Sequence, residues 1–347
     1  MSRPLRFAVI GAGSIAEAHA QAIAAASGAQ LRAVWGRNTE RGRAFAAVHG
    51  IEYWDDLEAL AASPDIDAAT IATPSGAHAL AALPFLLRGK AVLCEKPLEI
   101  SLPKIEALLS AARQSGAPLG CILQLRLGAS ARALKKAVVD GRFGRLALCS
   151  AYIKWWRDQA YYDSVAWRGT ADLDGGGALM NQGIHGVDLL QWLAGMPSEV
   201  FAFSARLAHE NIEVEDTVTV ALRYPNGALG VIEAATSCYP GTAIRIEIRG
   251  DRGSAILEDD RICKWDFDRA CEDDSNITAM QGGKIVSGAG NPKAISHEGH
   301  RMLVEDLVAA IHEHREPLVP AAEAVNAVRL ILGAYRSART RRPELLE

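Results

Sequence analysis

The first third of the chain alternates short apolar runs with longer stretches of helical period. The longer stretches repeat apolar residues every three or four positions, as a helix with one buried face does. Strands joined by helices of this length pair in parallel, so the pattern predicts an α/β doubly wound sheet covered on both faces. We expect strands at residues 7–10, 31–35, 68–72, 91–94 and 118–123, and helices at 15–26, from Thr39, and after Ser101.

After about residue 125, apolar and polar residues alternate one by one. This alternation predicts half-buried strands, and the Pro225-Asn226-Gly227 and 250–253 stretches are typical of hairpin turns. The sequence therefore predicts two domains: an N-terminal unit over residues 1–123 and an α+β unit over 124–347 with a large, mostly antiparallel sheet. Its expected strands lie at 198–207, 216–224, 228–235, 242–248 and 254–257, followed by an irregular stretch at 271–297 and helices at 300–312 and 321–338.

Composition narrows the class of partner. The 347 residues are 49% hydrophobic and carry a formal net charge of −4 without blocks of like charge, which argues against nucleic acid and membrane surfaces and favours a small molecule. No apolar run approaches the roughly 18 residues that span a bilayer, and the opening residues lack the hydrophobic region of a secretory signal. The six cysteines form no CxxC pair, so we expect reduced thiols, no metal site and a cytoplasmic location.

The first predicted strand leads into Gly11-Ala12-Gly13-Ser14-Ile15-Ala16, which opens the first helix. In this setting the first glycine permits a tight turn, the second lets the backbone approach a pyrophosphate, and the small Ala16 lets helix and strand pack closely. The N–H groups of the helix start would face the anion. The motif predicts a dinucleotide site that includes Gly11, Gly13, Ser14 and Ile15; the alternative is a glycine-rich turn without a ligand.

The end of the second predicted strand indicates which dinucleotide is used. An acidic residue is usual there for the ribose 2′-hydroxyl, but this chain has Gly36, followed by Arg37 and Asn38, with Arg41 one helical step away. A site without a carboxylate and with guanidinium donors favours a ribose that carries a 2′-phosphate over one with a 2′-hydroxyl. We therefore expect Arg37 and Asn38 to bind NADP(H); NAD(H) remains the alternative if Arg37 is only a solvated surface charge.

A lysine follows the fourth predicted strand in Glu95-Lys96-Pro97. Open α/β sheets bind ligands at the carboxyl ends of their strands, which is where this lysine lies. There it could polarise a carbonyl or exchange a proton with a reacting hydroxyl. The alternative is a solvated charge.

A second candidate lies on a predicted helix over residues 178–193, preceded by Gly175-Gly176-Gly177. Helical spacing would place Asn181, His185 and Asp188 on one face. Because alcohol oxidation requires a base for the hydroxyl proton, His185 is the candidate, although a lone helical histidine is usually structural. We expect Lys96, His185 and Asn181 to form the catalytic set.

Aromatic and cationic residues cluster just before these glycines, at 154–157, 161–162 and 167–169. Aromatic faces pack on the C–H surface of sugars, and arginine binds carboxylate or phosphate with two donors. We expect Arg157, Trp167 and Arg168 to bind substrate together with Asn181 and His185; the alternative is ordinary core packing with a cation–π pair.

With these motifs in order, the chain resembles the glucose-fructose oxidoreductase, inositol dehydrogenase and rhizopine catabolism (Gfo/Idh/MocA) family of oxidoreductases. The resemblance spans essentially the whole length. It is specific for the family and much less so for the substrate. The matching residues are Gly11-Ala12-Gly13, Ala72-Thr73-Pro74 with His78, Glu95-Lys96-Pro97, Trp167-Arg168-Gly169, Gly175–Gly177 with His185 and Asp188, and the tail from Ala310 through Pro317-Leu318 to Ala338.

The resemblance implies an NAD(P)-binding Rossmann domain followed by a substrate-binding and oligomerisation domain. It also implies a cis Lys96–Pro97 peptide, cofactor contacts from Thr73, Pro74, His78, Glu95 and Lys96, and a homodimer or homotetramer formed through the C-terminal sheet. Family members usually carry Asp where this chain has Asn181. An amide can hydrogen-bond a sugar hydroxyl but cannot hold a proton, so His185 alone would be the base.

Residues and resemblance together predict an NAD(P)-dependent oxidoreductase. It would transfer hydride between the nicotinamide cofactor and a hydroxyl or carbonyl of a sugar, an inositol-like polyol or a sugar nucleotide. Two alternatives stay open: a dinucleotide-binding sensor with reduced catalysis, and an enzyme that uses the cofactor transiently while cleaving a glycosidic bond.

Overall fold

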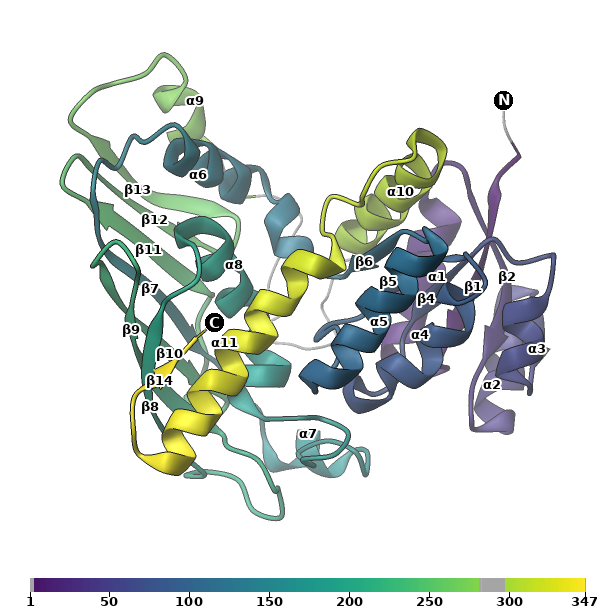
Figure 1. Cartoon of the computed structure of the whole chain (residues 1–347). Helices are drawn as coiled ribbons and strands as arrows, with labels where there is room; N and C mark the ends of the chain where they lie inside the picture. Colours follow the sequence, from purple (N-terminus) through teal and green to yellow (C-terminus); the bar gives the residue numbers. More distant parts are fainter. Residues whose placement is uncertain (1–2, 281, 283–296, 347) are drawn as a thin grey trace. The chain divides into compact units, whose positions relative to one another are not determined.

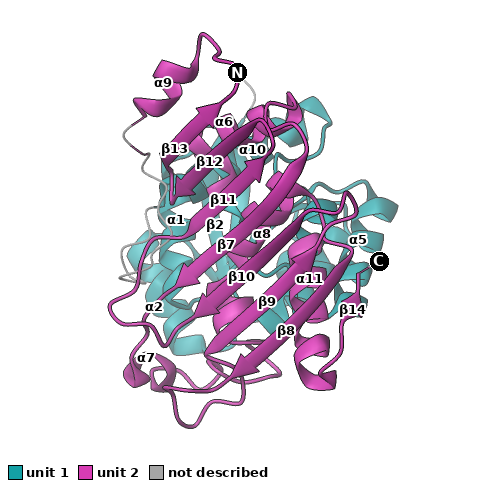
Figure 2. Ribbon diagram, turned by 90° about the vertical axis from the view of Figure 1, so that its left-hand side faces the viewer, with its two compact units in different colours: residues 1–124, 296–325 teal, residues 125–295, 326–347 magenta. Residues whose placement is uncertain are grey.

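The computed structural model describes residues 3–280, 282 and 297–346, which fold into two compact units. Unit 1 comprises Met1–Gln124 and Ser296–Val325, and unit 2 comprises Leu125–Ile295 and Asn326–Glu347 (Figure 2). The chain first passes from unit 1 to unit 2 after Gln124, one residue beyond the predicted domain boundary after residue 123. The second segment of unit 1, Ser296–Val325, was expected to belong to the second domain.

Unit 1 is built on a six-stranded parallel sheet in the order β3-β2-β1-β4-β5-β6 (Figure 1). The order reverses direction between β1 and β4, which is the point where such sheets bind dinucleotides. The predicted doubly wound sheet is confirmed. Its strands are β1 (Leu5–Ile10), β2 (Ala29–Trp35), β3 (Glu52–Trp54), β4 (Ala68–Ile71), β5 (Ala91–Cys94) and β6 (Leu119–Cys121).

The helices of unit 1 begin where the sequence offers caps. The side chain of Asn38 accepts from the Arg41 N–H at the start of α2, and Asp56 accepts from two N–H groups at the start of α3. Strand β3 was not predicted, because Glu52–Trp54 is a short, half-exposed edge strand without an apolar run, and the six-residue helix α3 after it was not predicted either. The helices are α1 (Ser14–Ala25), α2 (Thr39–His49), α3 (Leu57–Ala62), η1 (Ser75–Ala77), α4 (His78–Leu86), α5 (Leu102–Ser115) and α10 (Glu298–Glu313).

Helix α10 joins unit 1 because its buried side packs on α1 and on strands β5 and β2. The carboxylate of Glu305 accepts from the backbone N–H of Ser27, and Pro320 forms an isolated bridge with Gly120 beside β6. Nothing in a single sequence signals pairing across about 200 residues, so the linear reading assigned this helix to the second domain.

Unit 2 is built on an eight-stranded sheet in the order β13-β12-β11-β7-β10-β9-β8-β14 (Figure 2). Only β7 and β10 pair in parallel, so the predicted mostly antiparallel sheet is confirmed. Along β9, Val218, Val220 and Leu222 are buried, whereas Thr219 and Ala221 between them are exposed. The strands are β7 (Leu146–Lys154), β8 (Glu199–Ala205), β9 (Thr217–Arg223), β10 (Leu229–Ala235), β11 (Arg245–Gly250), β12 (Gly253–Glu258), β13 (Arg261–Phe267) and β14 (Glu344–Leu345).

The helical segments of unit 2 differ from the prediction at one important place. The helix expected over 178–193 is two elements, a π-helical turn η3 (Ala178–Gln182) and α8 (Ile184–Ala194), joined at Gly183. A π turn changes the angle between successive residues, so the simple i, i+4, i+7 argument for one shared face fails here. The other segments are η2 (Gln124–Leu127), α6 (Ala129–Val139), α7 (Gln159–Asp163), α9 (Asp274–Thr278) and α11 (Ala321–Thr340).

The stretch expected to be irregular, residues 271–297, contains the short helix α9, and its residues 281 and 283–296 lie outside the described part of the chain. None of the helices in the described ranges is long and apolar enough to cross a membrane.

Candidate functional site

The turn after β1 has the backbone that a dinucleotide site requires. Gly11 has φ +119°, and a Cβ atom there would lie 2.5 Å from the carbonyl oxygen of Ala72. A Cβ on Gly13 would instead meet nothing within 4 Å, which leaves open space beside the start of α1. Ala16 is fully buried against the sheet. Gly11 therefore brings the β1 and β4 loops together, and Gly13 leaves the helix start accessible to an anion.

At the end of β2, Gly36 is buried against Ala12, and Arg37 is exposed beyond it. Asn38 is also exposed, and its side chain caps α2 by accepting from Arg41. The hydroxyl of Tyr53 lies 3.2 Å from the carbonyl oxygen of Gly36. The strand end thus presents a guanidinium and no carboxylate at position 36.

The loop after β4 supplies an unsatisfied polar atom. The buried hydroxyl oxygen of Thr73 has no hydrogen-bond partner among the described residues, in the loop that Gly11 approaches. A bound ribose or phosphate would supply such a partner. Together with the open space at Gly13, this hydroxyl shows that the residues of this edge fit a dinucleotide.

His78, expected at the cofactor, is engaged by the chain itself. Its Nδ1 lies 2.7 Å from the carbonyl oxygen of Pro97, and its Nε2 lies 3.0 Å from that of Thr73. Burial lowers the pKa of His78, and the hydrogen bonds to the two carbonyl oxygens, which would raise this pKa, only partly offset the effect. A neutral ring donates to only one of the two oxygens, so His78 ties the β4 loop to the residue after Lys96.

Lys96 follows β5 directly, and the Lys96–Pro97 peptide is cis, as the resemblance implied. The preceding Glu95 is buried, and its carboxylate is surrounded by donors. One oxygen, Oε1, lies 3.1 Å from Nε2 of His19 and 2.9 Å from Nε2 of His300, while Oε2 accepts from the backbone N–H of Lys96. Neither histidine was predicted as a partner of Glu95, because His19 is one residue within an ordinary helical pattern and His300 lies 205 positions from Glu95.

The charge of this cluster follows from its contacts. Burial by itself would raise the pKa of Glu95, but hydrogen bonds from His19 and His300 outweigh it and hold the pKa well below its usual range. Burial lowers the pKa of His19, and this outweighs the attraction of Glu95. Glu95 is therefore a carboxylate at neutral pH, and His19 is neutral.

In unit 2 the structure brings the predicted aromatic and cationic residues together. The guanidinium of Arg157 lies 4.9 Å from the ring centroid of Trp155, and that of Arg168 lies 4.2 Å from the centroid of Tyr161 and 5.7 Å from that of Trp167. Arg157 is 4% exposed, and burial lowers its pKa. The cation–π packing is thus present, and binding of a substrate by these arginines stays a prediction.

Asn181 lies at the centre of a hydrogen-bond network in unit 2. Its amide nitrogen donates to the carboxylate of Asp174, and its oxygen accepts from Nε2 of Gln182. That nitrogen of Gln182 also lies 2.8 Å from the hydroxyl of Tyr161, and Oε1 of Gln182 accepts from Nε of Arg157. The amide at position 181 is thus held against a buried carboxylate seven residues earlier, which sequence reasoning missed because Asp174 belongs to no recognised motif.

Asp188 has a structural partner. Its two carboxylate oxygens accept from Nε and Nη2 of Arg126 at 2.8 and 2.7 Å, and both side chains are 2% exposed. This bidentate pair joins α8 to the η2 segment. His185, one turn earlier on α8, is also buried, with 7% of its surface exposed.

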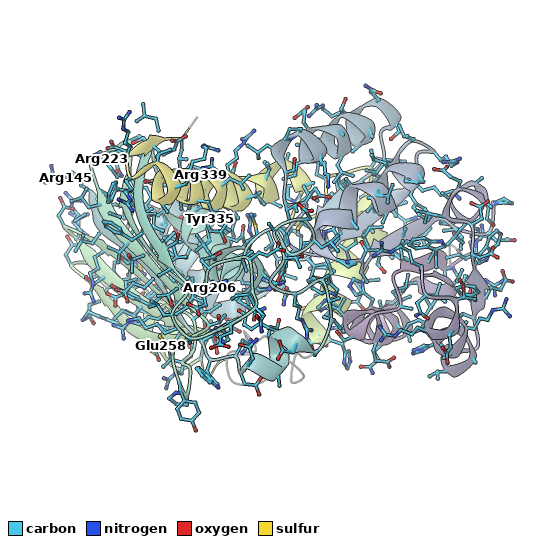
Figure 3. The ribbon with its side chains drawn as sticks, turned by 90° about the horizontal axis from the view of Figure 1, so that it is seen from below. Arg145, Arg206, Arg223, Glu258, Tyr335 and Arg339 are labelled. Carbon is cyan, nitrogen blue, oxygen red and sulfur yellow. The ribbon has the colours of Figure 1, made fainter. Side chains whose placement is uncertain are left out.

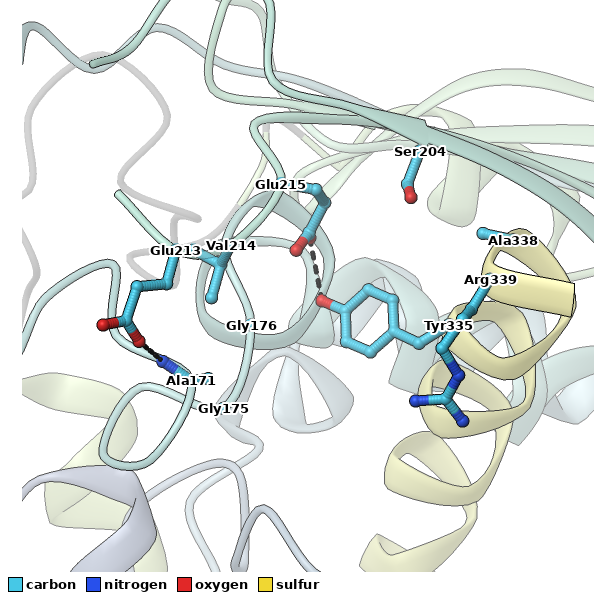
Figure 4. A pocket seen from close by; sticks show the side chains of 10 residues that line it. All are labelled: Ala171, Gly175, Gly176, Ser204, Glu213, Val214, Glu215, Tyr335, Ala338 and Arg339. Carbon is cyan, nitrogen blue, oxygen red and sulfur yellow. Dashed lines mark hydrogen bonds between the residues drawn. The ribbon is translucent and has the colours of Figure 1, made fainter. Parts of the chain in front are cut away.

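The three glycines before η3 approach other parts of unit 2. A Cβ on Gly176 would lie 2.2 Å from the hydroxyl of Tyr335, and one on Gly177 would lie 1.8 Å from the carbonyl oxygen of Glu215. The Glu215 carboxylate accepts from the Gly177 and Leu179 N–H groups and from Tyr335 (Figure 4). The glycines therefore let Glu215 cap the π turn that carries Asn181, where the sequence analysis expected approach to a ligand.

Gly176, Glu215 and Tyr335 are among the residues that line a pocket of about 380 Å³ in unit 2. Tyr335 and Arg339 enter it from the same helix, α11 (Figure 3), and Glu213 holds the backbone of Ala171 on the opposite wall (Figure 4). Burial raises the pKa of Glu215 although three donors surround its carboxylate.

Lys96 belongs to unit 1, whereas His185 and Asn181 belong to unit 2. The approach of these three groups to one substrate therefore stays a prediction. The predicted contacts of Glu95 with the cofactor and of Arg157, Trp167 and Arg168 with the substrate stay predictions as well.

Comparison with known proteins decides the family. Residues 5–122 match the model of an oxidoreductase family with an NAD-binding Rossmann fold, and residues 131–256 match the GFO/IDH/MocA C-terminal domain. The 1,5-anhydro-D-fructose reductase of Ensifer adhaerens is 31% identical over 72% of this chain and 75% of its own length. The chain belongs to the Gfo/Idh/MocA oxidoreductase family. The predicted family and the predicted class of enzyme are confirmed.

Other family members indicate the range of chemistry. The inositol 2-dehydrogenase of Rhizobium meliloti (strain 1021) is 30% identical over 74% of this chain and 76% of its own length. The structure of the WlbA dehydrogenase from Bordetella pertussis in complex with NADH and UDP-GlcNAcA matches with a TM-score of 0.89 and 32% identity, covering 100% of this chain and 99% of that one. This Gfo/Idh/MocA member is accordingly an NAD-binding oxidoreductase whose relatives act on sugars and polyols.

Proposed function

We propose that this enzyme transfers hydride between NADP(H) and a hydroxyl-bearing carbon of a sugar nucleotide whose sugar carries an acidic group. The observation that carries the proposal is the network of Asn181, Gln182 and Tyr161 with Arg157 and Arg168 beside it. Amide and phenol groups suit a polyhydroxylated ring, and buried or half-buried guanidinium groups suit a carboxylate or phosphate. The full-length match to a dehydrogenase bound to NADH and UDP-GlcNAcA supports the same class of substrate.

Each catalytic residue has a distinct task in this proposal. In the oxidative direction, His185 takes the proton of the reacting hydroxyl, and Lys96 donates a hydrogen bond to the same oxygen as negative charge develops on it. Asn181, held by Asp174, orients the hydroxyl and takes no proton. Bound at the Gly11 turn, the nicotinamide cofactor would supply the hydride acceptor, and the alcohol would become a carbonyl.

The preference for NADP(H) is part of the proposal and rests on the end of β2. Gly36 offers no carboxylate to a ribose hydroxyl, and the exposed Arg37 can pair with a 2′-phosphate. The Gly11 turn, the Gly13 opening and the Thr73 hydroxyl would hold the remainder of the cofactor.

We also infer that the protein is a homodimer or homotetramer assembled through the sheet of unit 2. The side chains of Phe203, Leu148 and Leu229 are 65%, 50% and 47% exposed, so the sheet presents apolar side chains to the surface. Ion pairs join neighbouring strands of the same sheet, including Arg223 of β9 with Glu199 of β8. Light scattering on the purified protein is expected to give a mass of two or four chains, and a monomer at micromolar concentration would refute this inference.

The test of the activity is a substrate panel with purified protein and either NADP⁺ or NAD⁺. The panel contains UDP-GlcNAcA, UDP-GlcNAc, the free acidic sugar, myo-inositol and 1,5-anhydro-D-fructose, and reduction of the cofactor is followed by absorbance. We expect turnover on UDP-GlcNAcA that is at least about tenfold more efficient than on the uncharged or free sugars, since one bidentate arginine contact is worth about that much. Turnover confined to inositol or free sugars would refute the proposed substrate class.

A matched pair of variants tests the guanidinium groups. Arg168→Leu is expected to raise KM for the acidic sugar nucleotide while leaving cofactor KM unchanged, whereas Arg223→Leu, on the exposed part of β9, changes neither. Tight dinucleotide binding without turnover on any compound would favour a sensor, and release of an aglycone without net cofactor reduction would favour glycosidic-bond cleavage.

A further inference from the structure

The pocket of about 380 Å³ in unit 2 takes no part in the proposed reaction, yet its size and lining suit a ligand. Small-molecule sites have volumes of about 300–1,000 Å³ and a few polar groups that converge on the space. Here Ser204 of β8 and Glu213 and Glu215, just before β9, line the pocket together with Tyr335 and Arg339 of α11 (Figure 4). All five residues belong to unit 2, so the pocket lies within one compact unit. We name it the α11 pocket.

Two opposite charges border the α11 pocket without pairing. The guanidinium of Arg339 has no ion pair or hydrogen bond in the part of the chain that the structure describes. The carboxylate of Glu213 holds the backbone N–H of Ala171 with Oε2, and its Oε1 accepts from none of the described residues. Arg206 lines an adjoining pocket with the same two glutamates, but its guanidinium donates to the carbonyl oxygen of Ile212. Both a cation and an anion are therefore available to a ligand.

Glu215 adds a second carboxylate to the lining. Its oxygens accept from the N–H groups of Gly177 and Leu179 and from the hydroxyl of Tyr335. Burial nevertheless raises the pKa of Glu215, so these donors do not fully compensate for the loss of water. A carboxylate accepts at about four lone-pair sites, so a positively charged donor from a ligand would stabilise its ionised form.

We propose that the α11 pocket binds a small zwitterion, with its ammonium group on Glu213 and Glu215 and its carboxylate or phosphate on Arg339. The ligand class follows from the unlike charges around one space. An anion alone would be repelled by the two carboxylates, and a cation alone would leave Arg339 without a partner. The hydroxyl of Ser204 offers a further hydrogen bond between the two ends of the ligand. The proposal goes beyond the proposed hydride transfer and does not depend on it.

Glu215 connects a ligand in the α11 pocket to η3, the turn that carries Asn181 and Gln182. The carboxylate of Glu215 caps this turn at the N–H groups of Gly177 and Leu179. A ligand that fixes the carboxylate therefore stabilises these hydrogen bonds and makes local opening of the turn rarer. Backbone N–H exchange at η3 thus reports occupancy of the pocket without any measurement of turnover.

Isothermal titration calorimetry of the full-length protein tests the class of ligand. The probes are ω-amino acids of increasing length, from glycine to 6-aminohexanoate, and phosphoethanolamine, which carries a phosphate in place of the carboxylate. Each probe is compared with the amine and the acid of the same length, which carry only one of its two charges. We expect the best zwitterion to bind with a Kd of about 1 mM or lower, and about tenfold more tightly than either single-charge analogue. Tightest binding of phosphoethanolamine would identify phosphate as the anionic group.

Matched variants test the position of the ligand. Arg339→Gln and Glu213→Gln each remove one charge from an exposed side chain, so both variants are expected to keep the fold. Each should weaken binding of the best zwitterion about tenfold, and in Arg339→Gln the zwitterion should bind no more tightly than its matching amine. The controls are Arg329→Gln, on the same helix, and Glu210→Gln, in the same loop as Glu213. Both residues are exposed outside the pocket lining, and both variants should stay within about twofold of the wild type.

Hydrogen exchange read by mass spectrometry measures the effect on η3. With the best zwitterion at saturation, we expect exchange in Ala178–Gln182 to be about threefold slower, and unchanged when the same concentration is added to Arg339→Gln. Binding without slower exchange at η3 would overturn the connection through Glu215.

Three results would overturn the site itself. The first is that no probe binds with a Kd of about 1 mM or lower. The second is that a single-charge analogue binds as tightly as the zwitterion. The third is that binding is unchanged in Arg339→Gln or in Glu213→Gln, which would place the probe elsewhere on the protein.

Discussion

The contact between Asn181 and Asp174 makes a sharp prediction for Asn181→Asp, the substitution that restores the residue usual in the family. In this protein the amide of Asn181 donates to a buried carboxylate, and the two residues are 9% and 2% exposed. The substitution would place two carboxylates at hydrogen-bond distance, about 3 Å apart. At an effective dielectric constant of about 20, two full charges at that separation repel by about 5 kcal/mol.

Proton uptake limits this penalty, because the new pair can share one proton. If the added carboxyl has a pKa of about 7 in the folded protein and about 4 in the unfolded chain, the three-unit rise costs about 4 kcal/mol at neutral pH. Since the folded pKa is the higher one, the cost is complete above about pH 7 and declines as the pH falls toward the unfolded value. At pH 5 it is about 1.4 kcal/mol.

Thermal unfolding at several pH values measures this effect. Domains of about 150–250 residues lose about 2–4 °C of Tm per kcal/mol, so Asn181→Asp should lower Tm by about 10 °C at pH 8 and by about 4 °C at pH 5. Asn226→Asp, the same chemical change in an exposed turn, serves as the control. The double variant Asn181→Asp with Asp174→Asn exchanges amide and carboxylate and should recover most of the loss. A Tm loss that is independent of pH, or no recovery in the double variant, would refute the assigned contact.

Three further predictions follow from single contacts. Arg37→Ala should raise KM for NADP⁺ about tenfold and for NAD⁺ less than twofold in steady-state assays, and equal changes would refute the 2′-phosphate assignment. Asp188→Asn leaves Arg126 buried without its charge partner and should cost about 3–5 kcal/mol in denaturant unfolding, so a loss below about 1 kcal/mol would contradict the buried pair. Tyr335→Phe removes a donor from Glu215 and should destabilise by about 1–2 kcal/mol, while an unchanged midpoint of unfolding would refute that role.

Structural features that depend on residues close together in the chain could be predicted from the sequence. The Gly11–Gly13 turn, the strand that ends at Lys96 and the alternation along β9 each depend on residue types at fixed short spacing, and the structure contains all three. The short edge strand β3 was missed because only three residues with no apolar run form it.

The features that sequence reasoning missed are long-range. His300 meets Glu95 across 205 positions, and Glu215 caps η3 from a separate loop. The π turn at Ala178–Gln182 was missed because its residues have ordinary helical propensity and because the cap that shapes it comes from elsewhere in the chain. Long-range contacts also explain why glycine is required at positions 176 and 177. Tyr335 lies too close to Gly176, and Glu215 too close to Gly177, for a Cβ atom to fit.

The central claim is that Lys96 and His185 act on one oxygen of an acidic sugar nucleotide. A crystal structure of the protein with reduced cofactor and UDP-GlcNAcA tests it most directly. We expect the Lys96 ammonium and a ring nitrogen of His185 to lie within hydrogen-bond distance of the same substrate hydroxyl, on the carbon that faces the nicotinamide. A complex in which the two side chains contact different substrate groups, or in which the nicotinamide faces another carbon, would contradict the claim.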